Sequence, residues 1–229
     1  MARRFDLLLW NSEAERTFSR RLWGELPGAV VGMSVEGPLA EYQRQSPYLL
    51  YCGRIDPNKG CEKMINYFRE LKRRRPSPLR LILTGALSME LPVDPDIQFL
   101  GFVSAEDRRR LMRNAMAFIM PSAFESFSIA TLEALEQQTP VLANIESQVV
   151  VSHLIKSGGG IIFCDGEGFV RSAQQLLEND TLRQEMGVRG RAYVQAHFSR
   201  PVIQRRLLDA IDSANFKLAS SGSNNAATI

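Results

Sequence analysis

The strongest constraint on this chain is a series of short apolar segments between residues 48 and 163, separated by amphipathic stretches. Each segment is almost continuously apolar and does not alternate between apolar and polar residues. That pattern is typical of parallel strands that are buried on both faces of a sheet. The expected strands are YLLYCG (48–53), LRLILTG (79–85), IQFLG (97–101), AFIMP (117–121), PVLA (140–143) and GIIF (160–163).

The segments between these strands have the period of helices. Residues 60–74 place Met64 and Phe68 on one face, with charged residues opposite. Ser104, with Asp107 three positions later, has the pattern of a capping box. Alternating strands and helices with short loops predict an α/β fold, a Rossmann-like doubly wound parallel sheet of about six strands with extra C-terminal helices.

The ends of the chain do not fit inside that sheet. Residues 1–45 have the pattern of a strand, a helix and a second strand, followed by a polar linker with prolines. We do not expect this segment to form a sheet of its own. Residues 46–200 hold the Rossmann-like domain, and residues 201–219 form a C-terminal helix. The small and polar residues 220–229 predict a disordered tail.

Composition and charge exclude several classes of protein. The net charge of +3 is too small to indicate a nucleic-acid partner. The basic runs at 72–76 and 108–113 lack aromatic stacking partners, so no nucleic-acid binding is expected. Three cysteines without metal-ligand spacing favour free thiols in a reducing compartment. We therefore expect a cytoplasmic protein, with peripheral contact to a membrane left open.

The Asp94-Pro95-Asp96 segment has a spacing that a metal site could use. A proline separates the two carboxylates, and they precede an expected strand where site residues would follow one. A turn is therefore the better interpretation. No metal site is expected.

Sheets of this type bind ligands at the carboxyl ends of their strands, near the point where the strand order reverses. The loop GRIDPNKG follows the first expected strand, and its Arg54 and Lys59 could converge on one anion. The alternative is a solvated turn with two surface cations. Phe102 and Val103 follow the third expected strand, and they suit either a slot for an aromatic base or the hydrophobic core.

The segment ESFSIATLE follows the fourth expected strand. Glu125 lies on the loop, and Glu133 would lie about one and a half turns into the following helix. The start of that helix presents backbone amides that attract anions, those of Phe127, Ser128 and Ile129. Carboxylates beside such a site can accept hydrogen bonds from sugar hydroxyls. The alternative is that both glutamates only favour the helix dipole and solubility.

The segments GRIDPNKG, LRLILTG, IQFLGFVS and PSAFESFSIATLEALEQQTPV, in this order, resemble the donor-binding domain of family 4 glycosyltransferases over roughly residues 47–200. The resemblance implies the GT-B architecture of two facing Rossmann-like domains. This chain would hold one half, with a remnant of the N-terminal acceptor half. The implied reaction is retaining, metal-independent transfer of a sugar from a nucleotide diphosphate-sugar. That donor is a co-substrate, and no cofactor is expected.

The resemblance also implies roles for individual residues. Arg54 and Lys59 would bind the diphosphate and stabilise the leaving nucleotide, and Glu125 would contact the donor sugar. Glu133 would hold the ribose hydroxyls. The other implied donor-binding residues are Gly53, the base-contacting Phe102 and Val103, and the phosphate-binding amides of Phe127, Ser128 and Ile129.

The chain departs from the family's pattern in two ways. The family usually has glycines where this chain has Ser126 and Ser128. Most of an acceptor domain is absent, so we expect a partner domain or subunit to supply it. The isolated chain is expected to bind a nucleotide diphosphate but to transfer sugar poorly. Two alternatives remain, a non-catalytic nucleotide-sugar-binding module and a Rossmann-like interaction domain with a decayed site.

Overall fold

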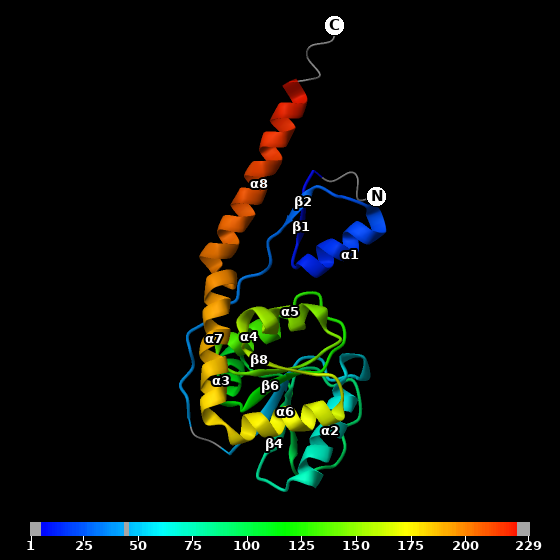
Figure 1. Ribbon diagram of the computed structural model, residues 1–229, viewed down its shortest axis with the longest axis vertical. Coiled ribbons are helices and arrows are strands. Elements are labelled where there is room, and N and C mark those ends of the chain that lie inside the picture. Colours follow the sequence, from blue (N-terminus) through cyan, green and yellow to red (C-terminus); the bar gives the residue numbers. More distant parts are fainter. Residues whose placement is uncertain (1–5, 44–45, 224–229) are drawn as a thin grey trace. The chain divides into compact units, whose positions relative to one another are not determined.

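The computed structural model describes residues 6–43 and 46–223, the side chains of 215–223 excepted. Its main element is a six-stranded parallel sheet in the order β5-β4-β3-β6-β7-β8, flanked by helices (Figure 1). The strands are β3 (Tyr48–Cys52), β4 (Arg80–Thr84), β5 (Ile97–Phe99), β6 (Ala117–Met120), β7 (Val141–Asn144) and β8 (Gly160–Phe163). Every expected strand is present, and the doubly wound, Rossmann-like α/β fold is confirmed.

Several of these strands are shorter at their carboxyl ends than the sequence predicts. Gly85 and Gly101 have φ angles of 121° and 67°, which a strand cannot contain. Pro121, directly after β6, carries no amide hydrogen and therefore cannot donate to a strand ladder. Glycine and proline thus fix where the buried strands end and the loops at the sheet edge begin.

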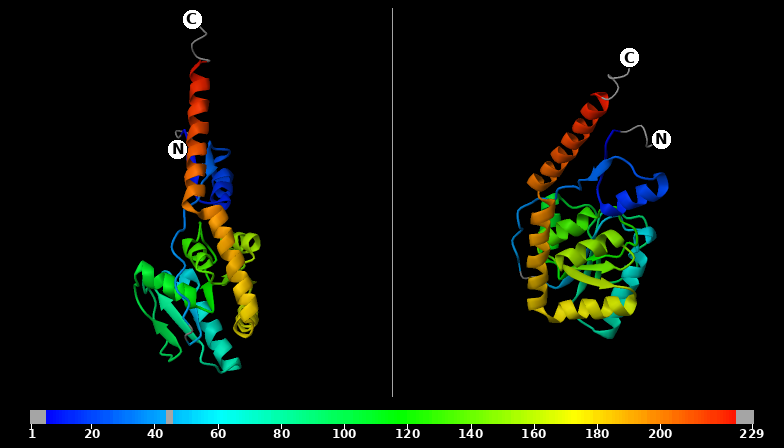
Figure 2. Two further views of the ribbon diagram at one scale, coloured as in Figure 1. Left: turned by 90° about the vertical axis from the view of Figure 1, so that its left-hand side faces the viewer. Right: turned by 45° about the horizontal axis from the view of Figure 1, so that its top comes forward.

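Helices cover both faces of the sheet (Figure 2). On one face, α2 (Cys61–Arg74) and α6 (Gly166–Glu178) pack together over a core that includes Leu49, Leu81 and Ile119. Right-handed crossovers place the helices that precede β6, β7 and β8 on the opposite face. These helices are α3 (Ala105–Asn114), α4 (Ile129–Glu136) and α5 (Gln148–Ser157).

Two helix caps follow the sequence pattern. Ser104 accepts a hydrogen bond at 3.0 Å from the amide of Asp107 and donates one at 2.7 Å to its carboxylate. Gly158 has a φ of 59° and closes α5 by donating its amide to the carbonyl of Leu154 at 2.8 Å. The expected N-cap at Ser104 is therefore confirmed.

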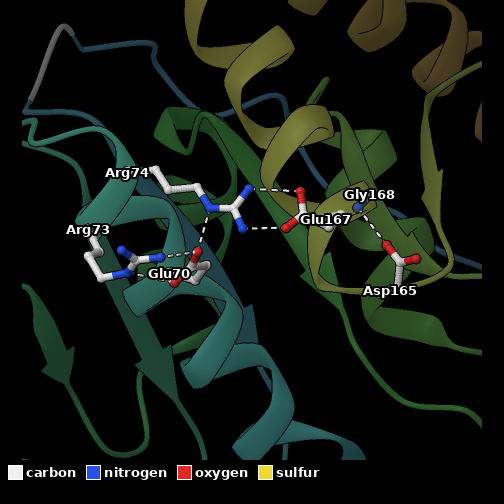
Figure 3. A network of polar contacts seen from close by, with 6 residues as sticks. All are labelled: Glu70, Arg73, Arg74, Asp165, Glu167 and Gly168. Carbon is white, nitrogen blue, oxygen red and sulfur yellow. Dashed lines mark hydrogen bonds and ion pairs between the residues drawn. The ribbon is translucent and has the colours of Figure 1, made fainter.

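A surface network joins the C-terminal end of α2 to the N-terminal end of α6 (Figure 3). Arg74 contacts Glu70 on its own helix, and its guanidinium also reaches Glu167 on α6, with one hydrogen bond of 2.7 Å. Arg73 contacts only Glu70 among the residues drawn there. Asp165 caps α6 by accepting from the amide of Gly168 at 2.7 Å.

The chain divides into two compact units, residues 35–195 and residues 1–34 together with 196–229. The first unit holds the six-stranded sheet and most of α7 (Asp180–Phe198). The second holds β1 (Leu8–Trp10), α1 (Glu13–Trp23), β2 (Gly28–Val30) and α8 (Arg200–Ser223). The sequence boundaries differ, because the linker belongs with the first unit and the C-terminal helix with the N-terminal strands. Among the described residues, no helix has the length and apolar character that crossing a membrane requires.

The expectation that the N-terminal segment forms no sheet of its own is wrong. β1 and β2 pair in parallel, with Leu8 opposite Gly28. The indole of Trp10 donates to the hydroxyl of Ser19 at 3.0 Å, and Arg206 of α8 reaches the carbonyl of Val31 at 3.4 Å. Packed helices therefore support two strands that would be marginal alone. Residues 220–223, expected in a disordered tail, belong to α8, and 224–229 lie outside the described residues.

Candidate functional site

A hollow of about 630 Å³ lies at the carboxyl edge of the sheet, within the unit of residues 35–195. The strand order runs outward from β3 in one direction and from β6 in the other, so the order reverses between these two strands. Ligands of doubly wound sheets bind in the crevice outside such a reversal. The lining comes from the ends of β3 and β4, from the loops after β3, β4 and β5, and from the helices α3 and α4: Cys52, Gly53, Arg54, Thr84, Gly85, Ala86, Phe102, Val103, Arg108, Ile129, Ala130 and Glu133.

The loop after β3 holds the two expected cations. Asp56 caps the short 3-10 helix η2 (Pro57–Lys59) by accepting from the amide of Lys59 at 3.0 Å. The guanidinium of Arg54 contacts the same Asp56 carboxylate and lines the hollow. Lys59 Nζ instead lies 2.7 Å from Oε1 of Glu125, on the loop after β6. Both cations are therefore held by carboxylates.

Close backbone contacts position this loop against its neighbours. Gly60 has a φ of 73°, and a Cβ there would lie 2.6 Å from the carbonyl oxygen of Pro121. Gly85 has a φ of 121°, and a Cβ there would lie 2.1 Å from the carbonyl oxygen of Gly53. Only glycine permits both approaches, so the loops after β3, β4 and β6 meet closely at this edge.

The start of α4 forms another wall of the hollow. Ser128, the N-cap residue, has a φ of 61° and a ψ of 64°, a left-handed conformation. Its hydroxyl lies 2.8 Å from that of Thr131. The side chain of Phe127 is buried, whereas Ile129 is 41% exposed and lines the hollow. The first amides of a helix lack partners within the helix, so this end of α4 can receive an anion.

Glu133 lies on the second turn of α4 and is paired across the hollow. Its Oε1 lies 2.7 Å from Nη2 of Arg108 on α3. Burial raises the pKa of the Glu133 carboxyl, and the charges of Arg108 and Arg109 oppose that rise. Sequence reasoning missed Arg108 as a site residue, because it treated the run at 108–113 as a charged outer face. The signal was the helical period, which allows one arginine of that run to face α4.

The exposure of Phe102 decides whether this residue belongs to the hydrophobic core. Its side chain is 84% exposed and lines the hollow, so the interpretation of Phe102 as a core residue is wrong. Val103 is half-buried beside it. An exposed aromatic ring in the lining of a hollow suits stacking against a planar group.

The expected site residues thus fall into two groups. The lining of the hollow contains Gly53, Arg54, Phe102, Val103, Ile129 and Glu133. The others lie beyond that lining, namely Lys59, Glu125, Phe127 and Ser128. Lys59 and Glu125 are joined to each other, and Phe127 and Ser128 lead into the start of α4.

Three residues that the sequence placed in a turn or on a charged outer face, Asp94, Asp96 and Arg110, form surface ion pairs. Asp94 and Asp96 flank a turn and pair with Arg69 and Lys72 of α2. Arg110 pairs with Glu106 on its own helix. Within the described residues, no three histidine, cysteine, aspartate or glutamate side chains form a group that could hold a metal ion.

Residues 41–193 match the family described as "Glycosyl transferases group 1". The matched segment covers more than half of the chain and contains the whole six-stranded sheet. The chain belongs to the group 1 glycosyl transferases. The lining of the hollow lies entirely within the matched segment.

Curated relatives in this family are similar over part of their length. "Uncharacterized glycosyltransferase YqgM" of Bacillus subtilis is 29% identical over 147 residues, which are 60% of this chain and 36% of that protein. "Capsular polysaccharide biosynthesis glycosyltransferase CapM" of Staphylococcus aureus is 24% identical over 170 residues, 69% of this chain and 43% of that protein. The chain therefore spans less than half the length of these relatives.

Solved structures share the fold at low identity. HepE of Anabaena, crystallised with UDP and glucose, has a TM-score of 0.79 at 17% identity, over 93% of this chain and 65% of that chain. Sucrose-phosphate synthase of Thermosynechococcus elongatus has a TM-score of 0.74 at 19% identity, over 95% of this chain and 59% of that chain. These structures show a shared fold, which agrees with the membership of the group 1 family.

Proposed function

We propose that the chain is the donor-binding half of a family 4, retaining glycosyltransferase that uses a nucleotide diphosphate-sugar. The observation that carries the proposal is the hollow at the strand reversal. A guanidinium, an exposed aromatic ring and a helix start surround it, together with a carboxylate on that helix. These groups match, in order, a diphosphate, a base, a second phosphate contact and a ribose.

The chemistry follows from where charge develops. Breaking the bond between the sugar and the diphosphate leaves negative charge on the departing phosphate. Arg54, Lys59 and the start of α4 lie on the elements around this hollow and would stabilise that charge. These fixed positive groups take the role that a metal ion plays in other transferases, so we propose metal-independent transfer.

Glu125 is the residue proposed to contact the donor sugar. Its side chain is 16% exposed and ion-paired with Lys59, so the carboxylate is held beside the cation proposed to bind phosphate. A carboxylate accepts hydrogen bonds from sugar hydroxyls, whereas it repels a phosphate. Lys59 and Glu125 together would therefore mark the junction between diphosphate and sugar.

We propose that an acceptor-binding half completes the site when transfer occurs. The hollow lies within residues 35–195, and the chain spans less than half the length of the relatives described above. The same observation favours a second candidate, a nucleotide-sugar-binding module that works only with a partner chain. Sugar transfer that appears on adding a separate N-terminal half would favour the split enzyme over the pure binding module.

The proposal is tested by thermal shift of the full chain with UDP, GDP and ADP and with their sugar conjugates. A ligand at about 100 times its dissociation constant adds roughly 2.7 kcal/mol of apparent stability. We expect one base to be preferred, and we expect chelation of divalent ions to leave binding unchanged. Arg54→Ala should weaken binding, whereas Arg73→Ala, which removes a surface arginine at the far end of α2, should not.

Two results would overturn the proposal. One is an unchanged melting temperature with every nucleotide and nucleotide-sugar. The other is equal binding by the wild-type chain and by Arg54→Ala, which would place the ligand away from the hollow.

A further inference from the structure

The peptide between Phe127 and Ser128 has a conformation that its sequence does not favour. The φ of 61° at Ser128 is one of two positive φ angles at non-glycine residues among those described, the other being Gln138. A left-handed conformation costs a residue with a Cβ roughly 1–2 kcal/mol. Some contact must therefore hold the chain in this conformation at the start of α4.

His153 makes such a contact with the peptide itself. It lies on α5 and is 7% exposed, and its Nε2 is 3.3 Å from the carbonyl oxygen of Phe127. Its Nδ1 is 2.9 Å from the hydroxyl of Tyr193 on α7. The ring of Phe127 also meets the imidazole edge-on, with centroids 6.0 Å apart. The histidine thus joins α7 to the loop that leads into α4.

The two partners fix where the imidazole proton lies. A carbonyl oxygen can only accept, so Nε2 carries the hydrogen and donates it to Phe127. The other nitrogen of a neutral ring then accepts, and Tyr193 donates its hydroxyl hydrogen to Nδ1. Burial lowers the pKa of His153 to about 4, so the ring is neutral at ordinary pH.

The orientation of one peptide follows from this hydrogen bond. In a trans peptide the carbonyl and the following N–H point in opposite directions. Because the Phe127 carbonyl faces His153, the N–H of Ser128 faces away from α5. A flip of this peptide would turn the N–H toward α5 and bring a carbonyl oxygen to the other side, where it would repel an anion.

A serine makes that flip favourable unless something opposes it. Flipping the peptide chiefly changes ψ of Phe127 and φ of Ser128, and it would return Ser128 to the negative φ that serine prefers. A glycine would gain nothing from the flip, because it adopts both signs of φ readily. The need for a restraint therefore arises from the serine at this position.

We infer that His153 and Tyr193 are positioning residues, which hold the Phe127–Ser128 peptide so that the Ser128 N–H faces a bound phosphate. The inference rests on the proposed function, since it assigns this amide to the phosphate of the donor. It adds a buried pair that touches no substrate and acts only through the backbone of the loop before α4.

The test is calorimetric titration of the full chain with UDP, GDP and ADP and with the corresponding nucleosides. His153→Leu should lower affinity for the preferred nucleoside diphosphate about tenfold, because a phosphate donor is turned away. Affinity for the nucleoside should change by less than about twofold, since the base and ribose contacts are unaffected. Tyr193→Phe removes only a hydroxyl and should cost about threefold, and it carries the test if His153→Leu does not fold.

A second substitution separates positioning from general damage. In a Ser128→Gly background, His153→Leu should cost less than about threefold, because glycine keeps the left-handed conformation without strain. Two results would overturn the positioning role alone. One is that His153→Leu lowers the affinity for the nucleoside and for the nucleoside diphosphate equally. The other is that His153→Leu lowers the affinity for the nucleoside diphosphate equally with serine and with glycine at position 128. Failure of the wild-type chain to bind any nucleotide would overturn the proposed function as well.

Discussion

The ion pair between Lys59 and Glu125 joins two residues whose proposed partners differ, a phosphate and a sugar. Lys59→Met should lower affinity for the nucleoside diphosphate and for the nucleotide-sugar about tenfold each, because both carry the diphosphate. Glu125→Gln should leave the affinity for the nucleoside diphosphate equal or higher. It should also abolish any increase in affinity that the wild-type chain shows for the nucleotide-sugar over the nucleoside diphosphate. Titration of both variants with UDP and UDP-glucose, or their counterparts with the preferred base, measures this. Parallel losses for both ligands in both variants would contradict the assignment.

Ser128 gives a stability prediction that needs no ligand. Ser128→Ala keeps the left-handed strain and loses the hydroxyl contact with Thr131, so it should destabilise the chain by about 1 kcal/mol. Ser128→Gly loses the same contact but removes the strain, so its effect should lie within about 0.5 kcal/mol of zero. Urea unfolding of the two variants provides the comparison. A glycine variant less stable than the alanine variant would argue against strain at this position.

His153 predicts a dependence of stability on pH. Burial holds its folded pKa at about 4, whereas the unfolded value is about 6.5, and Lys156 also disfavours the charged ring. As the pH falls from about 6.5 to about 4, the unfolded chain binds a proton at His153 that the folded chain does not bind. The contribution of His153 to the free energy of unfolding is therefore fully present above about pH 6.5, and the free energy falls by up to about 3 kcal/mol as the pH approaches 4.

The measurement compares wild type with His153→Gln by urea unfolding at about pH 7 and about pH 5. The glutamine variant has no ring to protonate, so its stability should fall less over this interval. Carboxylates lose the same interactions in both proteins, which makes the variant a matched control. Identical falls in the two proteins would show that His153 titrates normally in the folded chain.

The sequence predicted the positions of several candidate residues at the sheet edge better than their contacts. The loop positions of Arg54, Phe102 and Glu133 follow from local patterns, and all three line the hollow. The pairing of Glu133 with Arg108 depends on how α3 lies against α4, which no local pattern specifies. Lys59 and Glu125 are 66 residues apart, so their contact depends on the sheet, which brings the loops after β3 and β6 together.

At the scale of elements, composition predicted the four central strands, β3, β4, β6 and β7, because burial on both faces requires nearly every strand residue to be apolar. The edge strands β5 and β8 also read as apolar runs, although they are only partly buried. Strand ends were less certain, since an apolar run continues past the last ladder hydrogen bond until a glycine or proline changes the backbone. The runs ending in Gly85, Gly101 and Pro121 show this. Where a cap supplied its own signal, as Ser104 did, the start of the helix agreed closely.

The contacts of Arg74 connect α2 to α6 at the surface, and we expect them to stabilise the packing of these two helices. It contacts carboxylates on both helices, whereas Arg73 contacts Glu70 on its own helix (Figure 3). Arg74→Ala should therefore lower the melting temperature more than Arg73→Ala. The difference should shrink in about 0.5 M salt, because exposed ion pairs are screened. Equal effects of the two variants at low salt would show that the contact with Glu167 adds nothing.

At the scale of the whole molecule, the sequence separated the sheet domain from the chain ends but did not group those ends. Residues 1–34 and 196–229 form one unit although more than half of the chain lies between them. Their association rests on packing between β2 and α8, including the contact of Arg206 with the Val31 carbonyl. Short strands and a polar helix carry no local signal for such a long-range contact.

This division predicts that residues 35–195 fold without the rest of the chain. They contain the six-stranded sheet, the entire buried core around Leu49 and Phe169, and the lining of the proposed donor site. A fragment of these residues should unfold cooperatively in urea and bind the preferred nucleoside diphosphate within roughly threefold of the full chain. The fragment ends inside α7, after the buried Val194, so the helix should fray only in its last turn. A fragment that folds but binds more than about tenfold more weakly would show that the other unit contributes to the donor site.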